Sequence, residues 1–579
     1  MTVATTEEGL VRAGTLEELA AQGVRVVSAA GRTIAVFAHE GGVFAVDNRC
    51  PHMGFPLSRG TVSDGILTCH WHHAKFDLAG GCTFDPFADD VASFRTEVRD
   101  GEVYVDPRPI EEERLPHWMR KLDEGLEQNL RLVIAKAVVG LSDIGATGAI
   151  AERTALFATK NRASGWGDGL SILTAMSNVQ DVLAPADRSR ALYQGAINVA
   201  RNVSGEPPDF DLAPLTTGEA RPDVFRAWFR RFIETRSSDA AERCLRTAIH
   251  AGLSSEQLAD MLFSAATDHV FMDTGHALDF ANKACELLDH IGWKHADAIL
   301  PSLIPGLASA ERMEETSSWQ HPVDLPSLLR EANEALNAAL ERGGERLSGW
   351  DGHRVLAETI LDDEPKTSLK AIVAAAGDGV PLTELSATVA YAAARRPVHF
   401  HISNEFSDWN TVHHTFTYTN AVDQAMRRAP SRALARGILD GAMSVYLERF
   451  LNVPKQPLPR PTGHARTPAD ILNAFDRQQQ VDETAEAVAD LLAAGQHTAV
   501  IETLGHALLR EDAGFHQFQI YEAAVRQYHN FEGRPEGDHI LIGAARFLTA
   551  HSPTVRATGQ TFEIAQRLQR GEALHDSIS

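Results

Sequence analysis

The sequence predicts a two-part fold in which a small all-β domain precedes a large all-α domain. Before residue 107, runs rich in β-branched and aromatic residues alternate with glycine-containing turns, which is typical of short paired strands. From Pro116 onward, apolar residues recur every three or four positions in segments rich in Ala and Leu, which is typical of helices. The chain has 579 residues, so the helical part is the larger one and is long enough to bury a core of its own.

The expected elements follow in chain order. Strands are predicted at residues 24–27, 33–37, 43–46 and 103–105. The clearest helices are predicted at residues 130–139, 240–251, 255–266, 325–340 and 484–492.

The chain is therefore expected to contain two domains. We place the β domain at residues 1–107, a linker rich in proline and glutamate at 108–116, and a His-rich all-α domain, a candidate metal and substrate domain, at 117–579. A proline-rich stretch at 454–468 is a candidate subdivision of the helical domain.

Two short motifs in the β domain have the composition of a metal centre. Cys50-Pro51-His52 is followed, after sixteen residues, by Cys69-His70-Trp71-His72. Two Cys and two His at this spacing suit a [2Fe–2S] centre in which two thiolates bind one iron and two imidazoles bind the other. Zinc accepts the same residue types, but zinc-finger spacings place the two Cys together and the two His together. The mixed order therefore favours iron and sulfide.

The sequence around both motifs resembles the Rieske proteins of the ferredoxin and oxygenase type. Gly54-Phe55-Pro56-Leu57 follows the first motif, and the resemblance covers roughly residues 8–107. It implies a [2Fe–2S] cluster that receives electrons from a flavin-dependent reductase or a ferredoxin. The respiratory type carries an additional Cys beside each motif, whereas Met53 follows the first motif here, so no disulfide is expected. The implied ligands are Cys50, His52, Cys69 and His72.

Of the 25 histidines, 20 lie beyond residue 107, and several of these form clusters in the sequence. Segments at 252–282, 379–420 and 514–524 align as candidate internal helical repeats. The alignment gives His276, His414 and His516 equivalent positions near helix starts, and three imidazoles in one space would bind iron, zinc or copper. The alternative is that Ala-rich helices align readily and that each His is structural. Weaker candidate ligands from other histidine clusters are His269 and His399.

A more distant resemblance concerns the segments that carry two of these histidines. Residues 271–278 and 412–417 resemble the histidine-bearing helix starts of questin-oxidase-like proteins, which are helical non-haem-iron oxygenases acting on polycyclic aromatic quinones. That resemblance implies iron held by several His and a carboxylated Lys, for which Lys283 is the candidate. The family members concerned lack an attached Rieske module, so the chain departs from their pattern at its N-terminal part.

Composition limits the classes of partner and the compartment. A formal net charge of −24 argues against generic nucleic-acid binding, which needs a basic surface. Five Cys with no framework pattern indicate a reducing compartment. No run of eighteen apolar residues and no signal-peptide pattern is present, so we expect no membrane partner and a cytoplasmic location.

The leading functional hypothesis combines the two parts. The cluster would pass electrons to a mononuclear non-haem Fe(II) in the helical domain, and this iron would activate O₂ to oxidise a small organic, candidate aromatic, substrate. By analogy with Rieske oxygenases, a homo-oligomer is a candidate assembly. The alternative is a Rieske ferredoxin-like electron-transfer or redox-sensing protein whose helical domain docks partners.

Overall fold

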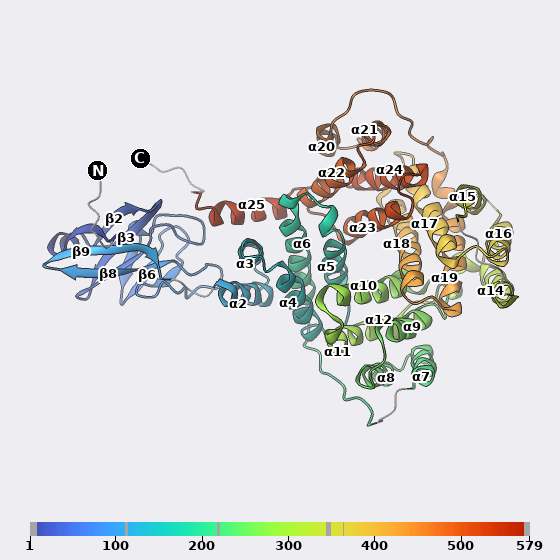
Figure 1. Cartoon of the computed structure of the whole chain (residues 1–579), viewed down its shortest axis with the longest axis horizontal. Helices are drawn as coiled ribbons and strands as arrows, with labels where there is room; N and C mark the ends of the chain where they lie inside the picture. Colours follow the sequence, from blue (N-terminus) through green and yellow to red (C-terminus); the bar gives the residue numbers. More distant parts are fainter. Residues whose placement is uncertain (1–8, 111–113, 217–220, 343–348, 363, 573–579) are drawn as a thin grey trace. The chain divides into compact units, whose positions relative to one another are not determined.

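The computed structural model describes residues 9–110, 114–216, 221–342, 349–362 and 364–572. The chain forms two compact units, one comprising Met1–Ile150 with Thr558–Ser579 and the other Ala151–Ala557. A small β domain followed by a large helical part confirms the predicted fold class (Figure 1). Residues 111–113 of the predicted linker lie outside the described residues.

The described strands of the first unit form two antiparallel sheets. The larger sheet has the order β1-β9-β8-β4-β3-β2, and the smaller has the order β5-β6-β7. Four of the strands, β2, β3, β4 and β9, cover the predicted strand positions. The bounds are β1 (Val11–Thr15), β2 (Val24–Ala29), β3 (Arg32–His39), β4 (Gly42–Asp47), β5 (Thr61–Ser63), β6 (Ile66–Thr68), β7 (Lys75–Asp77), β8 (Ser93–Arg99) and β9 (Glu102–Pro109).

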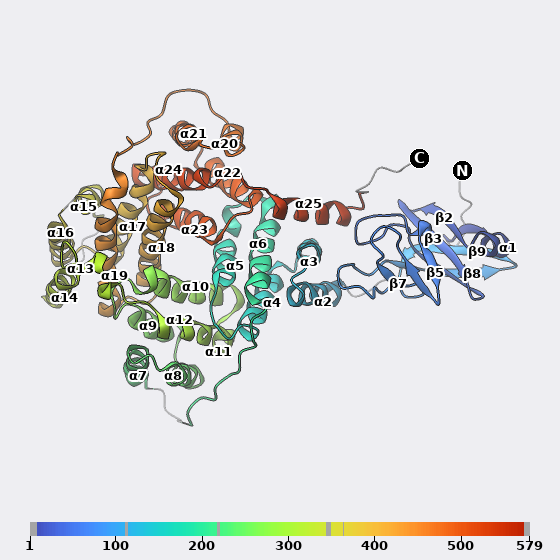
Figure 2. The same cartoon turned by 180° about the vertical axis from the view of Figure 1, so that it is seen from behind.

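The larger sheet curves until its first and last strands, β1 and β2, come into contact, which makes it nearly a barrel. Its interior is filled by alternate side chains such as Val36, Ala45 and Val103, as the period-two pattern of a strand requires. A short helix, α1 (Leu16–Gln22), was missed by the strand-based prediction; it begins with a capping box between Thr15 and Glu18 (Figure 2). The smaller sheet packs around a second core that contains Cys50 and Cys69.

Both units contain helices, and the predicted helical positions fall in α3, α8, α9, α14 and α21. The first unit contains α2 (Arg114–Glu127), α3 (Arg131–Asp143) and α25 (Ala557–Gln569), with α4 (Thr147–Lys160) at the junction. The second unit begins with α5 (Asp168–Asn178), α6 (Pro185–Val203), α7 (Pro222–Glu234), α8 (Ser238–His250), α9 (Ser255–Ala266), α10 (His276–Ile291), α11 (Ala296–Ile299), α12 (Ile304–Ser309), α13 (Ser317–Gln320) and α14 (Leu325–Arg342). It continues with α15 (His353–Leu361), α16 (Pro365–Gly377), α17 (Leu382–Val398), α18 (Phe406–Arg428), α19 (Arg432–Leu447), α20 (Pro468–Phe475), α21 (Val481–Ala493), α22 (His497–Arg510), α23 (Phe515–Asn530) and α24 (Pro535–Ala550).

Three helices in the middle of the second unit matter most for the site. The helix α18 packs against both α10 and α23, and both views show the three side by side (Figures 1 and 2). Buried small side chains, such as Ala281 of α10, Thr419 of α18 and Ala523 of α23, contribute to the packing of these helices.

Two further sequence predictions concern loops and membranes. In the described chain no helix or strand interrupts the proline-rich stretch between η7 (Glu448–Asn452) and α20. Among the described residues, no helix combines the length and apolar character needed to cross a bilayer.

Candidate functional site

The two Cys/His motifs lie on loops that are folded in the same way. In the first loop, the backbone N–H of Cys50 donates to the carbonyl of Phe55, and the N–H of Gly54 donates to the carbonyl of Cys50, at 2.8 and 2.7 Å. In the second loop, Cys69 is bonded in the same pattern to Ala74 and His73, at 2.9 and 3.0 Å. Each Cys is thus clamped to the residues four and five positions later.

Both loops close through a residue in the left-handed region. Gly54 has φ of +82° and His73, four positions after its own Cys, has φ of +61°. Glycine adopts this conformation without strain, whereas for histidine it is uncommon. The side chain of His73 is exposed, and its backbone has the role that Gly54 has in the other loop.

The four motif side chains converge. The rings of His52 and His72 have centroids 4.8 Å apart at 81°. The side chains of Cys50 and Cys69 are buried and hydrogen-bonded to each other. This bond lowers the pKa of Cys69 to about 6 and, together with burial, raises that of Cys50. Thiolate, the form that binds iron, is therefore accessible at Cys69 near neutral pH.

One atom of the group supports a bound cofactor directly. Nδ1 of His52 is buried and has no hydrogen-bond partner among the described residues. Burial also lowers the pKa of His52 to about 4, so its ring is neutral and offers a lone pair. A buried polar atom without a partner is costly, and an iron ion in front of it would remove that cost. The four residues therefore fit a [2Fe–2S] cluster.

A second group of ligand atoms lies in the helical unit. His276 begins α10, His414 lies in the third turn of α18, and His516 lies in the first turn of α23. One ligand nitrogen from each side chain lies within 4.8 Å of the others. The Nε2 atoms of His414 and His516 are 3.1 Å apart. We call these residues the His triad.

The electrostatics of the His triad favour neutral imidazoles. Burial lowers the pKa of His276 to about 3 and that of His516 to about 4, and it also lowers that of His414. Neutral imidazole is the form that binds transition metals. A helix start positions the first ligand, because Gly275 (φ +95°) caps α10 immediately before His276.

A fourth imidazole, His413, lies beside the His triad and was not selected from the sequence. Its side chain is fully buried, and its ring centroid is 4.6 Å from that of His516. Neither ring nitrogen has a hydrogen-bond partner in the described part of the chain. Its only sequence signal was its position next to His414, which periodicity assigns to a different helix face.

The weaker candidates are held elsewhere. His269 bonds to Glu314 and Glu234, each at 2.5 Å, and His399 bonds to the carbonyl of Gln456 at 2.8 Å. Neither belongs to the His triad, the group of three side chains whose ligand atoms lie close enough to hold a metal ion.

Lys283, the candidate carboxylated lysine, forms a buried ion-pair network. Its Nζ donates to Glu286 and to Glu522, both at 2.8 Å. Burial alone would lower the pKa of Lys283, but attraction by the two carboxylates outweighs it and the pKa is raised. The two carboxylates favour the ammonium form of Lys283, whereas carboxylation requires a neutral amine. This environment therefore disfavours carboxylation of Lys283. Asn178 of α5 donates to both glutamates and closes the network.

Aromatic rings surround one side of the His triad. The ring of Phe280 stacks on His276 with centroids 5.1 Å apart, and that of Phe515 lies 5.6 Å from it. The site is thus bordered by apolar surface on this side.

Comparison with known proteins identifies the domain that carries the two Cys/His motifs. Residues 10–95 match the Rieske [2Fe-2S] domain family. The 3-phenylpropionate/cinnamic acid dioxygenase ferredoxin subunit of Photorhabdus laumondii is 36% identical over 93 residues, which are 16% of this chain and 88% of that protein. The chain belongs to the Rieske [2Fe-2S] domain family.

Other relatives share only the Rieske domain. The 4beta-methylsterol monooxygenase of Methylococcus capsulatus is 48% identical over 54 residues, 9% of this chain and 15% of that protein. Among solved structures, the ferredoxin of carbazole 1,9a-dioxygenase from Nocardioides aromaticivorans is 24% identical, with a TM-score of 0.17; the match covers 18% of this chain and all of that one. The resemblance of the helical part to questin-oxidase-like proteins stays a prediction.

One residue from outside the Rieske domain reaches its first ligand loop. Lys136, in the middle of α3, donates its Nζ to the carbonyl of Pro51 and, at 3.3 Å, to that of His52. Burial lowers its pKa to about 8. A lysine inside an otherwise apolar helix was the available sequence signal, and it was not used.

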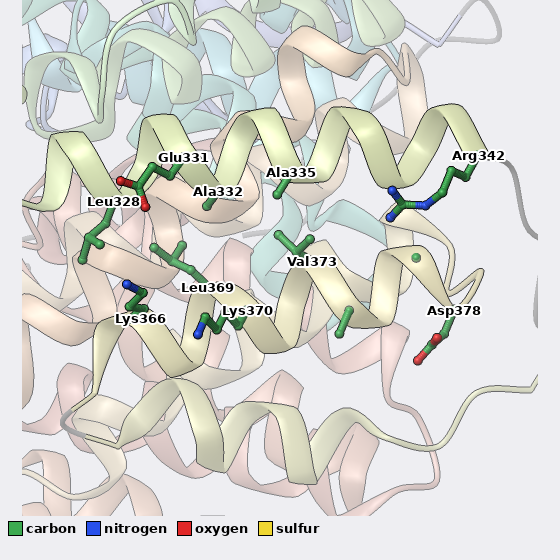
Figure 3. Close-up of a pocket in the computed structure, with 12 residues that line it drawn as sticks. Leu328, Glu331, Ala332, Ala335, Arg342, Lys366, Leu369, Lys370, Val373 and Asp378 are labelled. Atoms are coloured by element: carbon green, nitrogen blue, oxygen red, sulfur yellow. The ribbon is translucent and has the colours of Figure 1, made fainter.

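A groove of about 500 Å³ lies between α14 and α16 (Figure 3). Leu328 and Val373 contribute apolar surface, and Glu331, Lys366 and Lys370 contribute charge. None of its lining residues belongs to α10, α18 or α23, so the groove is separate from the His triad.

Proposed function

We propose that the protein is an iron-dependent oxygenase that uses two metal centres. Cys50 and Cys69 would bind one iron of the Rieske cluster, and His52 and His72 the other. The His triad would bind a mononuclear non-haem Fe(II) that activates O₂. The observation that carries the proposal is the meeting of three neutral imidazoles from three helices within 4.8 Å.

The residues of the two candidate sites support distinct tasks. When bound, the cluster supplies one-electron transfer at a potential raised by its imidazole ligands. The loops around Cys50 and Cys69 fix the thiolates by paired backbone hydrogen bonds. In the helical unit, the three His would hold the iron by imidazole nitrogens, and a site with three protein ligands would have room for oxygen and substrate.

The substrate class follows from the border of the site. Phe280 and Phe515 present aromatic surface beside His276. An apolar, aromatic organic molecule would stack there in preference to a charged one. A flavin-dependent reductase or a ferredoxin would supply the electrons, as expected for a chain whose relatives include ferredoxin components of dioxygenase systems.

The test is metal content combined with single substitutions. Protein purified without oxygen and reconstituted with Fe²⁺ and sulfide should contain about three irons and about two sulfides per chain. His276→Ala, His414→Ala and His516→Ala should each lose the additional iron while the spectrum of the reduced cluster is unchanged. His269→Ala and His399→Ala are matched controls that should retain it.

Two results would count against the oxygenase. A wild-type chain with only the cluster irons after reconstitution would favour the electron carrier, which the match over 88% of a ferredoxin subunit also supports. Retention of the additional iron in all three triad variants would show that the metal binds elsewhere.

A further inference from the structure

The ammonium of Lys136 occupies an unusual position for a charge. Its side chain is 7% exposed in α3, whose neighbouring residues, such as Ile134 and Val138, are apolar and fully buried. Transfer of an unpaired ammonium from water into such surroundings is strongly unfavourable. The charge must therefore be compensated locally.

The compensation comes from the cluster-binding loop and from one carboxylate. The two carbonyls that accept from Lys136, those of Pro51 and His52, belong to the first ligand motif. Asp89 attracts the ammonium and is itself bonded to His117 of α2, with Oδ1 and Nε2 at 3.1 Å. Lys136 thus places a positive charge on the backbone of the loop between Cys50 and His52.

We propose that Lys136 is a positioning residue that raises the reduction potential of the Rieske cluster and fixes the loop that carries Cys50 and His52. The inference rests on the cluster ligands assigned above and not on the His triad. Reduction adds one negative charge to the cluster. A nearby buried ammonium stabilises that charge, and the effect is large because the surroundings have a low dielectric constant.

The proposal gives the helix α3 a role in electron entry. The charge comes from a helix outside the matched domain, residues 10–95, so an isolated Rieske domain of this type would lack it. The cluster would then be easier to reduce in the full chain, which favours electron transfer from a reductase of moderate potential.

The experiment compares cluster potentials in full-length protein at pH 7, followed by the electron paramagnetic resonance signal of the reduced cluster. Lys136→Met removes the charge and keeps most of the side-chain volume. It should lower the midpoint potential by at least ~59 mV, which is a tenfold change in the one-electron reduction equilibrium. Lys136→Arg should stay near the wild-type value.

Two further variants separate charge from packing. Lys121→Met is the matched control, because Lys121 of α2 is also buried but pairs with Glu124 at 3.0 Å instead of binding a ligand loop. It should shift the potential by a small fraction of the Lys136→Met change. Asp89→Asn removes the opposing charge and should shift the potential upward, a change of sign that a structural defect would not produce.

The possible outcomes are distinct. The inference would be overturned if Lys136→Met kept the wild-type midpoint potential and an intact electron paramagnetic resonance signal. It would also be overturned if Lys121→Met shifted the potential as much as Lys136→Met. If Lys136→Met binds no cluster, the Asp89→Asn variant decides. A midpoint potential that falls or stays unchanged in Asp89→Asn overturns the inference, and a midpoint potential that rises supports it. Absence of a Rieske signal from the wild-type chain would instead contradict the proposed cluster ligands.

Discussion

The Nε2 atoms of His414 and His516 face each other at 3.1 Å, although 102 positions separate the two residues in the chain. Each neutral imidazole has one nitrogen that donates and one that accepts. In the absence of a metal, one Nε2 must carry a hydrogen and donate to the other. With a metal bound, both lone pairs can point at the same cation, together with His276.

This arrangement predicts that metal stabilises the helical unit. Fe²⁺ at 100 times its dissociation constant should raise the free energy of unfolding by about 2.7 kcal/mol, because only the folded chain brings the ligands together. The measurement is thermal unfolding by circular dichroism, without oxygen, at several metal concentrations. His414→Ala and His516→Ala should abolish the metal effect and His399→Ala should keep it. Equal stabilisation in all variants would contradict the assignment.

A second prediction concerns the ion-pair network around Lys283. Lys283→Met leaves the carboxylates of Glu286 and Glu522 buried without their shared cation, although Arg526 still bonds to Glu522 at 3.2 Å. Removal of one partner from a buried pair costs about 3 kcal/mol or more. Urea unfolding should report this loss. Changing both glutamates to Gln in the Lys283→Met background should recover part of it, because no unpaired carboxylate remains.

No recovery in that triple variant would mean that Lys283 acts through packing and not through charge. Retention of wild-type stability by Lys283→Met alone would show that the ammonium is not needed, which the carboxylated-lysine hypothesis would allow.

The Rieske domain could be predicted because its signal is local. Cys50 and His52 share one loop, and Cys69 and His72 share another, so spacing alone indicates the ligand set. The four strands with strong β-branched patterns were predicted for the same reason. The short strands β5, β6 and β7 were missed because three-residue strands leave almost no pattern to detect.

The helical site was predicted only in part, because its residues meet through packing. Comparing segments identified His276, His414 and His516, but not His413, whose ring reaches His516 from the adjacent position of α18. The polar side chains of Lys283 and Glu286 would suggest an exposed face on an isolated helix. In the structure they are buried because α23 brings Glu522 to them, a contact across 239 positions.

A third prediction is a pH-dependent loss of stability caused by Glu448. Its side chain is fully buried, Thr415 donates to Oε1, and Oε2 has no partner within the described residues. Burial raises its pKa to about 8, with opposing effects from Thr415 and Arg396. The pKa of Glu448 in the folded chain lies above its pKa in the unfolded chain. The contribution of its protonated carboxyl group to the free energy of unfolding is therefore full below about pH 4.5 and is lost as pH rises through 8.

The isosteric Glu448→Gln variant should remove this dependence. Wild-type stability should fall relative to the variant by at most about 1.4 kcal/mol per pH unit between pH 5 and 8. Urea unfolding at half-unit pH intervals provides the measurement, and the exposed Glu483→Gln is the control. Parallel pH profiles for wild type and Glu448→Gln would refute the role of this carboxyl group.

The last prediction compares the two glycines that end α10. Gly275 has φ +95° and ψ −12°, in the left-handed region, where alanine carries a strain of about 1–2 kcal/mol. Gly292 has φ +100° and ψ 135°, a positive-φ conformation that costs alanine about 1–3 kcal/mol. Their surroundings differ. A Cβ at Gly275 would lie 2.8 Å from Cβ of Tyr418 and 3.0 Å from Phe271, whereas at Gly292 the nearest atoms are 3.7 Å away.

Gly275→Ala must therefore displace the helix start that carries His276, and we expect the affinity of this variant for Fe²⁺ to fall about tenfold or more. Gly292→Ala should lose at least as much stability through backbone strain and yet keep its metal affinity. Metal titration and urea unfolding of both variants would separate the two effects, and equal affinities would show that the start of α10 does not position the ligand.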